Sequence, residues 1–237
     1  MRPSTITPFV TGDYTAPPGH RLAGQRVLVV AYLIRHPDAV VLLDTGFPFD
    51  SPYTVTDGEV DLPTYPRSLE SELAALDTSL AEVDVVVNCH LHIDHAGGNF
   101  RLPAGAPIYV QEMEYAANVD ETEELVRDAL ALDRQAYRRI EGETEILPGI
   151  TALPTPGHTA GHQSLIVETA AGRFLLGGQS MPSASDFALA MYTRRLEREG
   201  NEPVPEYPAW LPRIAELNPV RAMFAHDLAV WEPSPSA

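Results

Sequence analysis

The densest polar cluster of the chain reads Asn88-Cys89-His90-Leu91-His92-Ile93-Asp94-His95-Ala96-Gly97-Gly98-Asn99. It directly follows residues 83–88, whose apolar side chains predict a short buried strand. His90 and His92 are two residues apart, so both imidazoles can face the same way on extended backbone. Neutral imidazoles together with one carboxylate, here from Asp94, suit zinc, iron, manganese or cobalt. Four candidate ligands within six residues therefore predict a metal site.

Two similar pairs of apolar stretches lie on either side of this cluster. Residues 27–34 and 39–43 predict a hairpin that ends in the polar loop Asp44-Thr45-Gly46, and residues 164–167 and 173–176 predict a second one. Their similar length and pattern favour a duplicated unit. Residues 47–66 contain four prolines and predict a loop.

Further segments complete an alternation of strands and helices. Apolar spacing predicts helices over residues 68–80, 120–140 and 210–217, and strands over residues 107–110 and 220–225. Neither GxGxxG nor GxxxxGK[ST] occurs, so the pattern predicts an α/β protein without a dinucleotide-binding or P-loop motif.

Composition and charge limit the partners that the chain can bind. Its 237 residues suffice for one sizeable core, and the formal net charge of -17 repels nucleic acid and anionic membranes. The longest apolar run, residues 27–34, is far shorter than the roughly 20 residues that span a bilayer. The single cysteine, Cys89, cannot form an intrachain disulfide. We therefore expect a cytoplasmic protein that binds neither nucleic acid nor membrane.

The polar cluster also carries a family resemblance. HLHIDHAGG resembles the HxHxDH motif of the metallo-β-lactamase superfamily, and other features resemble that family in the same order: AVVLLDTG, TPGHTAGH and FAHD. The stretches TPGHTAGHQSL, PIYVQEMEY and AHD are most similar to the quorum-quenching N-acyl homoserine lactonases and related lactone hydrolases. The resemblance implies a single domain over residues 1–237, folded as an αββα sandwich of two mixed sheets with helices on the outer faces. It also implies two metal ions at one edge.

The resemblance implies a ligand for each family position. The first site would comprise His90, His92 and His158, and the second Asp94, His95 and His226. One or two zinc ions are expected, with iron, manganese or cobalt as alternatives. The implied reaction is the opening of a small neutral lactone or ester by metal-bound hydroxide, which Asp94 would orient before it protonates the leaving alkoxide. Because lactonases are often dimers, a homodimer is one expectation.

One position departs from the family pattern. Gln179 stands where the family has an Asp that bridges both metals, and the next acid, Asp186, lies seven residues further on. A neutral amide oxygen can ligate one metal but bridges poorly, which predicts weaker binding of one ion. The site would then be dinuclear without a protein bridge, mononuclear or degenerate. The resemblance also implies a Tyr that contacts the lactone carbonyl. In this chain Pro182 and Ser183 stand near that position, and Tyr192 is a distant substitute at best.

Three alternatives to lactone hydrolysis remain at this stage. The chain can be another ester or thioester hydrolase of the same fold, an inactive relative that binds a metabolite, or a mononuclear iron oxidoreductase. The replacement at Gln179 motivates the last two alternatives.

Several other side chains have simpler interpretations. His162 is expected to make a structural hydrogen bond, Cys89 to be a small buried residue whose neighbour His90 faces the other way, and His20 and His36 to lie on the surface. Asp44 either orients a metal ligand or closes a turn. An acyl pocket is one interpretation of a set of loop-proximal apolar residues, namely Phe47, Tyr53, Met181, Phe187 and Trp210.

Overall fold

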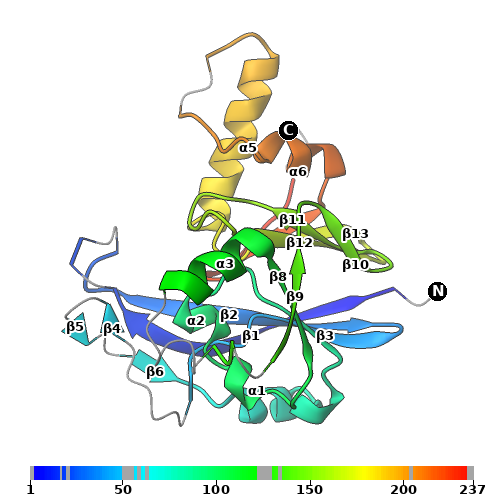
Figure 1. Cartoon of the computed structure of the whole chain (residues 1–237). Coiled ribbons are helices and arrows are strands. Elements are labelled where there is room, and N and C mark those ends of the chain that lie inside the picture. Colours follow the sequence, from blue (N-terminus) through cyan, green and yellow to red (C-terminus); the bar gives the residue numbers. More distant parts are fainter. Residues whose placement is uncertain are drawn as a thin grey trace.

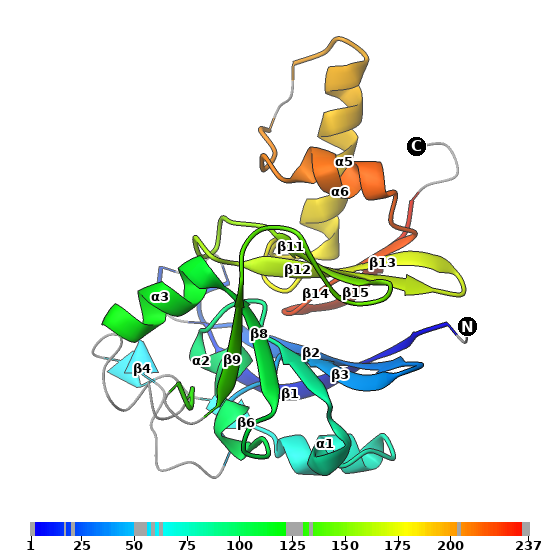
Figure 2. The same ribbon diagram turned by 45° about the vertical axis from the view of Figure 1, so that its right-hand side comes forward.

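Two β-sheets packed face to face form the centre of the protein, and helices lie on their outer surfaces (Figures 1 and 2). This computed structural model describes residues 3–16, 18–19, 22–49, 56–57, 60–61, 64–121, 130–132, 135–202 and 205–233. Both sheets are mixed, so the predicted α/β sandwich is confirmed.

The first sheet has the strand order β6-β1-β2-β3-β7-β8-β9. Its strands are β1 (Thr5–Thr15), β2 (Arg26–His36), β3 (Ala39–Leu43), β6 (Thr64–Pro66), β7 (Val85–Val87), β8 (Pro107–Gln111) and β9 (Ala136–Ile140). The predicted first hairpin is confirmed, because β2 and β3 pair antiparallel with Tyr32 opposite Leu43. β7 then pairs parallel to β3, which brings the polar segments after both strands to the same edge.

The second sheet has the order β10-β11-β12-β13-β14-β15. Its strands are β10 (Thr144–Leu147), β11 (Ile150–Pro154), β12 (Gln163–Thr169), β13 (Gly172–Leu176), β14 (Arg221–Phe224) and β15 (Asp227–Trp231). β12 and β13 form the predicted second hairpin, and β14 lies parallel to β13. Each sheet thus contains an antiparallel hairpin with a parallel neighbour. A short separate ribbon joins β4 (Thr56–Asp57) to β5 (Val60–Asp61).

The helices and short helical turns cover or connect the sheets. They are α1 (Leu69–Ala75), η1 (Leu80–Glu82), α2 (Ile93–Ala96), η2 (Asn99–Arg101), α3 (Glu112–Glu121), α5 (Ala184–Arg198) and α6 (Leu211–Leu217). α1 packs Leu69 and Leu73 beneath the first sheet, whereas α5 and α6 cover the second (Figure 2). Within the described residues, none of these helices has the length and apolar character needed to cross a membrane.

Apolar side chains from both sheets meet in one core. Val30, Tyr32 and Leu43 from the first sheet contact a cluster that includes Leu165 and Leu176 from the second. β2 is buried along most of its length because β1 and β3 flank it and packed layers cover both faces. This burial explains the continuous apolar run that the sequence shows over residues 27–34.

The predicted helix over residues 120–140 is wrong over its last five residues. α3 ends at Glu121, and residues 136–140 form the edge strand β9, paired parallel to β8. Residues 122–129, 133 and 134 lie outside the described part. Leu132 and Ile140 fit a helical stripe, but Tyr137 and Ile140 also alternate with exposed Arg138 and Arg139 as a strand does.

The predicted loop over residues 47–66 also needs correction, because β6 within it pairs antiparallel with β1. The remaining predicted elements are present, and all but β8, which extends by one residue to Gln111, are shorter than predicted. The first helix ends near Leu76, and the strands at residues 83–88 and 220–225 shorten to β7 and β14.

Candidate metal centre

The histidine-rich segment lies where β7 ends and the chain turns into the short helix α2. The backbone N–H of Thr45 donates to the carbonyl of His95 at 2.8 Å, and the N–H of Gly98 donates to the carbonyl of Gly46 at 3.0 Å. A Cβ atom on Gly98 would lie 2.5 Å from the carbonyl oxygen of Thr45, so no side chain fits there. The glycine therefore permits the close contact that holds the segment against the loop after β3.

Three imidazoles form the first ligand group: His90, His92 and His158. The rings of His90 and His92 have centroids 4.5 Å apart, and both lie 4.7 Å from the ring of His158. Nδ1 of His92 and Nε2 of His158 are 3.0 Å apart. Two nitrogens on one tetrahedral zinc ion would be roughly 3.3 Å apart, given Zn–N bonds of about 2.0–2.1 Å.

The second ligand group consists of Asp94, His95 and His226. Oδ2 of Asp94 lies 3.3 Å from Nε2 of His95 and 3.6 Å from Nε2 of His226. The two imidazole nitrogens are 3.4 Å apart. The two groups adjoin, because the rings of His90 and His95 have centroids only 4.2 Å apart. The structure thus brings together the six histidine and aspartate side chains that the sequence analysis assigned as metal ligands.

The state of two imidazole nitrogens, one on His90 and one on His226, fits a cation. Nε2 of His90 is fully buried and has no hydrogen-bond partner among the described residues. Nδ1 of His226 donates to the carbonyl of Leu28 at 2.7 Å, which leaves its Nε2 unprotonated when the ring is neutral. Imidazole nitrogens that converge with one carboxylate are the donor set of a zinc or iron site.

The carboxylate of Asp44 contacts His95 of the second ligand group and the backbone that follows β7. Its Oδ2 lies 2.9 Å from Nδ1 of His95, and its Oδ1 accepts from the backbone N–H of Cys89 at 2.8 Å. The residue has a positive φ of 65° at the end of β3. Of the two interpretations left open by the sequence, the geometry therefore favours orientation of His95.

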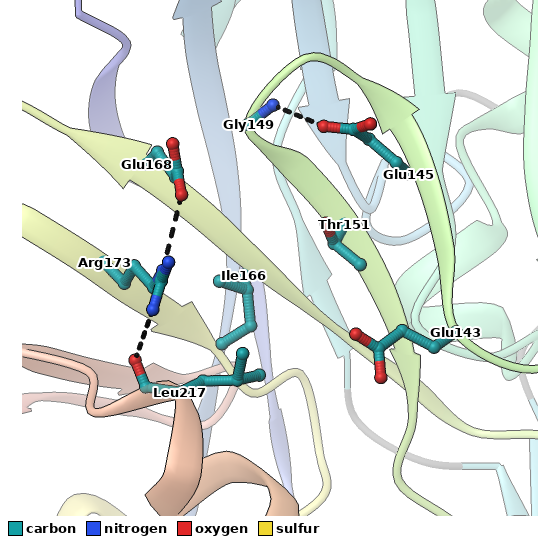
Figure 3. A pocket seen from close by; sticks show the side chains of 8 residues that line it. All are labelled: Glu143, Glu145, Gly149, Thr151, Ile166, Glu168, Arg173 and Leu217. Carbon is teal, nitrogen blue, oxygen red and sulfur yellow. Dashed lines mark hydrogen bonds and ion pairs between the residues drawn. The ribbon is translucent and has the colours of Figure 1, made fainter.

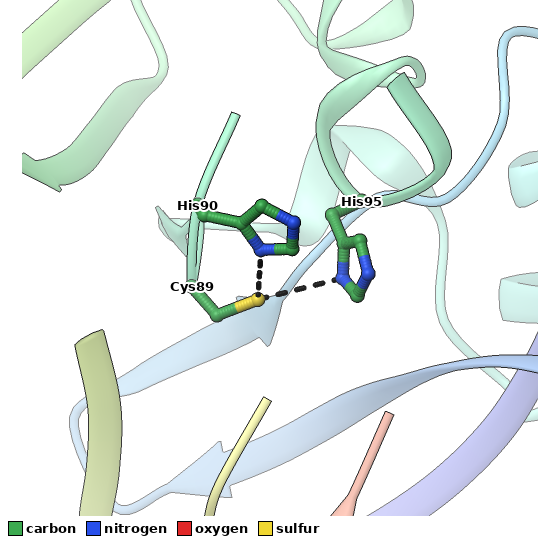
Figure 4. Close-up of side chains that lie close together, drawn as sticks. All are labelled: Cys89, His90 and His95. Atoms are coloured by element: carbon green, nitrogen blue, oxygen red, sulfur yellow. Dashed lines mark hydrogen bonds between the residues drawn. The ribbon is translucent and has the colours of Figure 1, made fainter. Parts of the chain in front are cut away.

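Cys89 is buried, as expected, but its direction differs from the expectation. Its Sγ lies 2.9 Å from Oδ2 of Asp44 and 3.1 Å from Nδ1 of His90, between the rings of His90 and His95 (Figure 4). Burial, and then the Asp44 carboxylate, raise the pKa of the thiol to about 12. The thiol is therefore protonated and can donate. Cys89 and His90 contact each other because β7 ends at Val87, so their side chains need not alternate as on a strand.

Electrostatics keep most of these imidazoles neutral. Burial and neighbouring imidazoles lower the pKa of His90 well below its usual value and that of His158 to about 4. Although burial opposes ionisation, the imidazole of His95 lowers the pKa of Asp94. Conversely, although burial opposes a charged ring, the Asp94 carboxylate raises the pKa of His95, so a proton and a cation would compete for that ring.

Glu114, which the sequence did not single out, ties the two ligand-bearing loops together. Its Oε1 accepts from the backbone N–H of Leu91 at 2.9 Å, and its Oε2 accepts from the hydroxyl of Thr159 at 2.6 Å. The side chain is almost fully buried. Its only sequence signal was its place within PIYVQEMEY, because nothing local shows that α3 faces the metal loops.

Gln179 contacts His162, whose ring centroid lies 5.5 Å from that of the ligand His90. Its N–H donates to Nε2 of His162 at 3.0 Å, and its side-chain Oε1 is buried without a hydrogen-bond partner among the described residues. Asp186 does not take its place, because its carboxylate accepts from the hydroxyl of Ser183 at 2.5 Å in the cap of α5. The structural hydrogen bond expected for His162 is confirmed, since its Nδ1 also pairs with the hydroxyl of Thr155 at 2.9 Å.

Several peripheral expectations were wrong. His36 is buried rather than on the surface, because its Nε2 donates to the carbonyl of Pro148 at 3.0 Å. Tyr192 is exposed on α5 and stacks on Arg195. The expected acyl pocket does not form as a set: one cluster beneath α5 and α6 buries Met181, Phe187 and Trp210. Phe47 is buried against Tyr14 instead, and His20 and Tyr53 lie outside the described residues.

Two hollows differ in their relation to the ligands. One of about 360 Å³ borders His92 and is lined by Met113, Glu114, Ala117, Asn118, Thr159, Ala160 and Gly161. The other, of about 140 Å³, lies on the second sheet, and none of the ligand residues lines it (Figure 3). There the guanidinium of Arg173 donates to the carboxylate of Glu168 and to the carbonyl of Leu217, so the positive charge of Arg173 is already paired.

Known proteins are similar to this chain in sequence. An N-acyl homoserine lactonase from Bacillus sp is 36% identical over 153 residues, covering 60% of this chain and 58% of that protein. The Bacillus cereus lactonase is 33% identical over 167 residues, covering 65% and 63%. The alignments thus span less than two thirds of these relatives. The lactonase AttM of Rhizobium johnstonii is 30% identical over 239 residues, covering 88% and 85%.

Solved structures match over nearly the whole chain. An N-acyl homoserine lactone hydrolase with the product N-hexanoyl-L-homoserine at its catalytic metal centre has a TM-score of 0.73 and 26% identity, covering 96% of this chain and 95% of that one. A family profile described as the metallo-beta-lactamase superfamily matches residues 24–187. That range contains five of the six converging side chains, from His90 to His158, and the chain belongs to the metallo-β-lactamase superfamily.

Proposed function

We propose that this protein is a metal-dependent hydrolase that opens a small lactone of the N-acyl homoserine lactone class. The observation that carries the proposal is the pair of adjoining ligand groups, whose imidazole nitrogens and one carboxylate converge at the edge of the sandwich. The lactonase relatives and the structural match with bound N-hexanoyl-L-homoserine support the same chemistry.

His90, His92 and His158 would hold one zinc ion, and Asp94, His95 and His226 a second. Zinc bound there supplies a Lewis acid that polarises the ester carbonyl and lowers the pKa of water. Asp94 serves as the catalytic group, because its ionised carboxylate can hold the attacking water by a hydrogen bond, accept a proton from it and pass that proton to the leaving alkoxide. A neutral lactone also suits a chain with a formal net charge of -17, since no anion must approach.

Gln179 decides how many ions the site holds. Its buried, unpaired Oε1 is available as a neutral ligand, but it adds no negative charge between two dications. We therefore propose that one ion binds more weakly than the other. The same observation supports the second candidate function, a relative that binds a metabolite without hydrolysing it.

Hydrolysis is tested by supplying N-hexanoyl-homoserine lactone to the zinc-loaded protein. Ring opening creates a carboxylic acid, so proton release in a weakly buffered indicator solution reports turnover, and mass spectrometry identifies the added water. His90→Gln should abolish turnover and reduce the bound metal. His36→Gln is the matched control, because it alters a buried histidine that pairs with Pro148 instead of the ligand groups.

The outcome separates the two candidates. Metal-loaded protein that opens no lactone, although elemental analysis finds zinc at the site, would reject hydrolysis and support the metabolite-binding alternative.

A further inference from the structure

The strand β1 contains an irregularity close to the second ligand group. Its pairing with β2 shifts between Val10, opposite Val30, and Gly12, opposite Val29, so that one residue is inserted. Gly12 has a φ of 155°, and a Cβ atom there would lie 2.9 Å from the ring of Phe47. Bulges of this kind occur next to active sites, where they redirect the side chains that follow.

Tyr14 lies two residues beyond Gly12 on β1, after Asp13, which pairs with Arg26. Its ring is nearly perpendicular to the imidazole of His226, with centroids 6.0 Å apart, and it meets Phe47 in a similar way at 6.2 Å. Tyr14 is half-buried, whereas Tyr65 on the neighbouring strand β6 is 52% exposed. The bulge thus packs one tyrosine of this sheet edge against a proposed metal ligand.

The hydroxyl of Tyr14 has no hydrogen-bond partner among the residues that the structure describes. Because the Tyr14 side chain is only half-buried and its hydroxyl lacks a partner among the described residues, this hydroxyl is available to a molecule bound beside the ligand group. Asp94 and His95 both act electrostatically on this hydroxyl, which puts it on the side of the second ligand group. Burial, and then the Asp94 carboxylate, raise the pKa of this phenol to about 12, so it is protonated at neutral pH and can donate.

We propose that Tyr14 donates a hydrogen bond to an oxygen atom of the molecule bound at Asp94, His95 and His226. This inference rests on the proposed function only in that the second ligand group holds a metal. In lactone hydrolysis, the acceptor is the ester carbonyl oxygen as it gains negative charge, and the hydrogen bond strengthens as that charge develops. Tyr14 belongs to β1, outside every sequence motif that points to the metal.

A carboxylate probe tests the hydrogen bond without any turnover. The cobalt(II)-loaded protein is titrated with hexanoate, and binding is followed by the visible absorption of the cobalt. Tyr14→Phe should weaken hexanoate binding by about tenfold, because one hydrogen bond to a charged group is lost. Tyr65→Phe is the matched control and should bind hexanoate as the unaltered protein does, since its ring lies under Arg26 at the surface.

Kinetics with N-hexanoyl-homoserine lactone give the second measurement. Tyr14→Phe should lower kcat by about tenfold or more while KM changes little, because the hydrogen bond matters most when the oxygen is charged. Hexanoate binding that depends on Tyr14 in a protein that opens no lactone would keep this inference and reject the proposed function.

Three results would overturn the inference. They are equal hexanoate affinity in the Tyr14→Phe and unaltered proteins, absence of hexanoate binding in the unaltered protein, and loss of cobalt or of thermal stability in Tyr14→Phe. The last result would assign Tyr14 a packing role only.

Discussion

The orientation of each imidazole depends on what its second nitrogen contacts. His226 donates to the carbonyl of Leu28, His95 meets the carboxylate of Asp44, and His162 pairs with Thr155. These contacts fix the tautomer, and the tautomer decides which nitrogen can face a cation. Single substitutions beneath the ligands should therefore affect metal binding without removing any ligand.

Asp44→Asn should weaken metal binding at the second ligand group by about 10- to 100-fold, because His95 loses its charged partner. Asparagine tolerates positive φ, so the backbone at this position should keep its conformation. Competition with a chelator measures the affinity. Asp38→Asn, at an exposed carboxylate, is the control, and equal loss in both variants would contradict the role given to Asp44.

Gln179→Asp should raise metal occupancy, because a carboxylate restores negative charge between the two ligand groups. We expect the chelator concentration that strips the weaker ion to rise by about tenfold or more, as a change of 1.4 kcal/mol would give. Gln179→Asn has the same side-chain length as the Asp variant but stays neutral, so it separates charge from geometry. Unchanged occupancy in Gln179→Asp would show that this position does not face the metals.

His162 should make the metal-free protein sensitive to acid. Burial lowers its pKa to about 3, whereas the unfolded chain takes up the proton near pH 6.5. The unfolded state therefore binds more protons, and the free energy of unfolding falls as the pH drops from 6.5 towards 3. His162→Gln should flatten this slope in urea titrations by at most about 1.4 kcal/mol per pH unit. An unchanged slope would mean that His162 is already protonated in the native state.

Most of the proposed ligands could be read from the sequence, because HxHxDH places four of them within six residues. Asp44 was open to two interpretations, since a strand-ending Asp followed by Thr-Gly also fits a plain turn. Glu114 was missed because its partners, Leu91 and Thr159, lie in other loops. Local pattern carries no information about such contacts.

Among the secondary-structure elements, those with strong periodicity were predicted best. β2 and β12 have long apolar runs, and both hairpins were found with their partners. β9 was taken as helix because a strand at the edge of a sheet is half exposed and its apolar residues are sparse. α5 was not predicted at all, although Ser183 caps it and Phe187 and Ala190 are buried, because its exposed Leu189 and Tyr192 blur the apolar stripe.

The carboxylate of Glu114 holds α3 against the two ligand-bearing loops. Glu114→Gln should lower the free energy of unfolding by about 1–3 kcal/mol, because two charge-assisted hydrogen bonds to the metal loops are weakened. For a chain of this size, each kcal/mol corresponds to about 2–4 °C in Tm, which calorimetry resolves. Glu112→Gln, which removes only a surface contact to Arg139, should change Tm little. Equal shifts in both variants would refute the clamping role of Glu114.

In the whole molecule, the ligands come from both sheets. His90, His92, Asp94 and His95 follow β7 in the first sheet, whereas His158 and His226 lie in loops of the second. The apolar core likewise combines the two sheets. Both observations support our proposal that residues 1–237 form one domain.

Metal removal should therefore destabilise the whole protein. A ligand present at about 100–1,000 times its Kd adds about 3–4 kcal/mol to the free energy of unfolding, so a chelator should lower Tm by roughly 6–16 °C. The combined variant His158→Gln with His226→Gln leaves only first-sheet ligands, and its Tm should respond little to the chelator. A Tm that does not depend on metal in the unaltered protein would contradict a site shared between the sheets.

The placement of ligands on opposing sheets also affects the rate of metal exchange. An ion held by both sheets leaves only after side chains of both sheets have released it, so rotation of one side chain is not enough for its escape. Concerted release of several ligands is rarer than the motion of one side chain, and here it includes the buried His90 as well as the exposed His92 and His158. The ion that contacts both sheets through buried His90 and through His158 would then exchange slowly even if its equilibrium affinity were modest. Residence time and affinity would become separate properties of the same site.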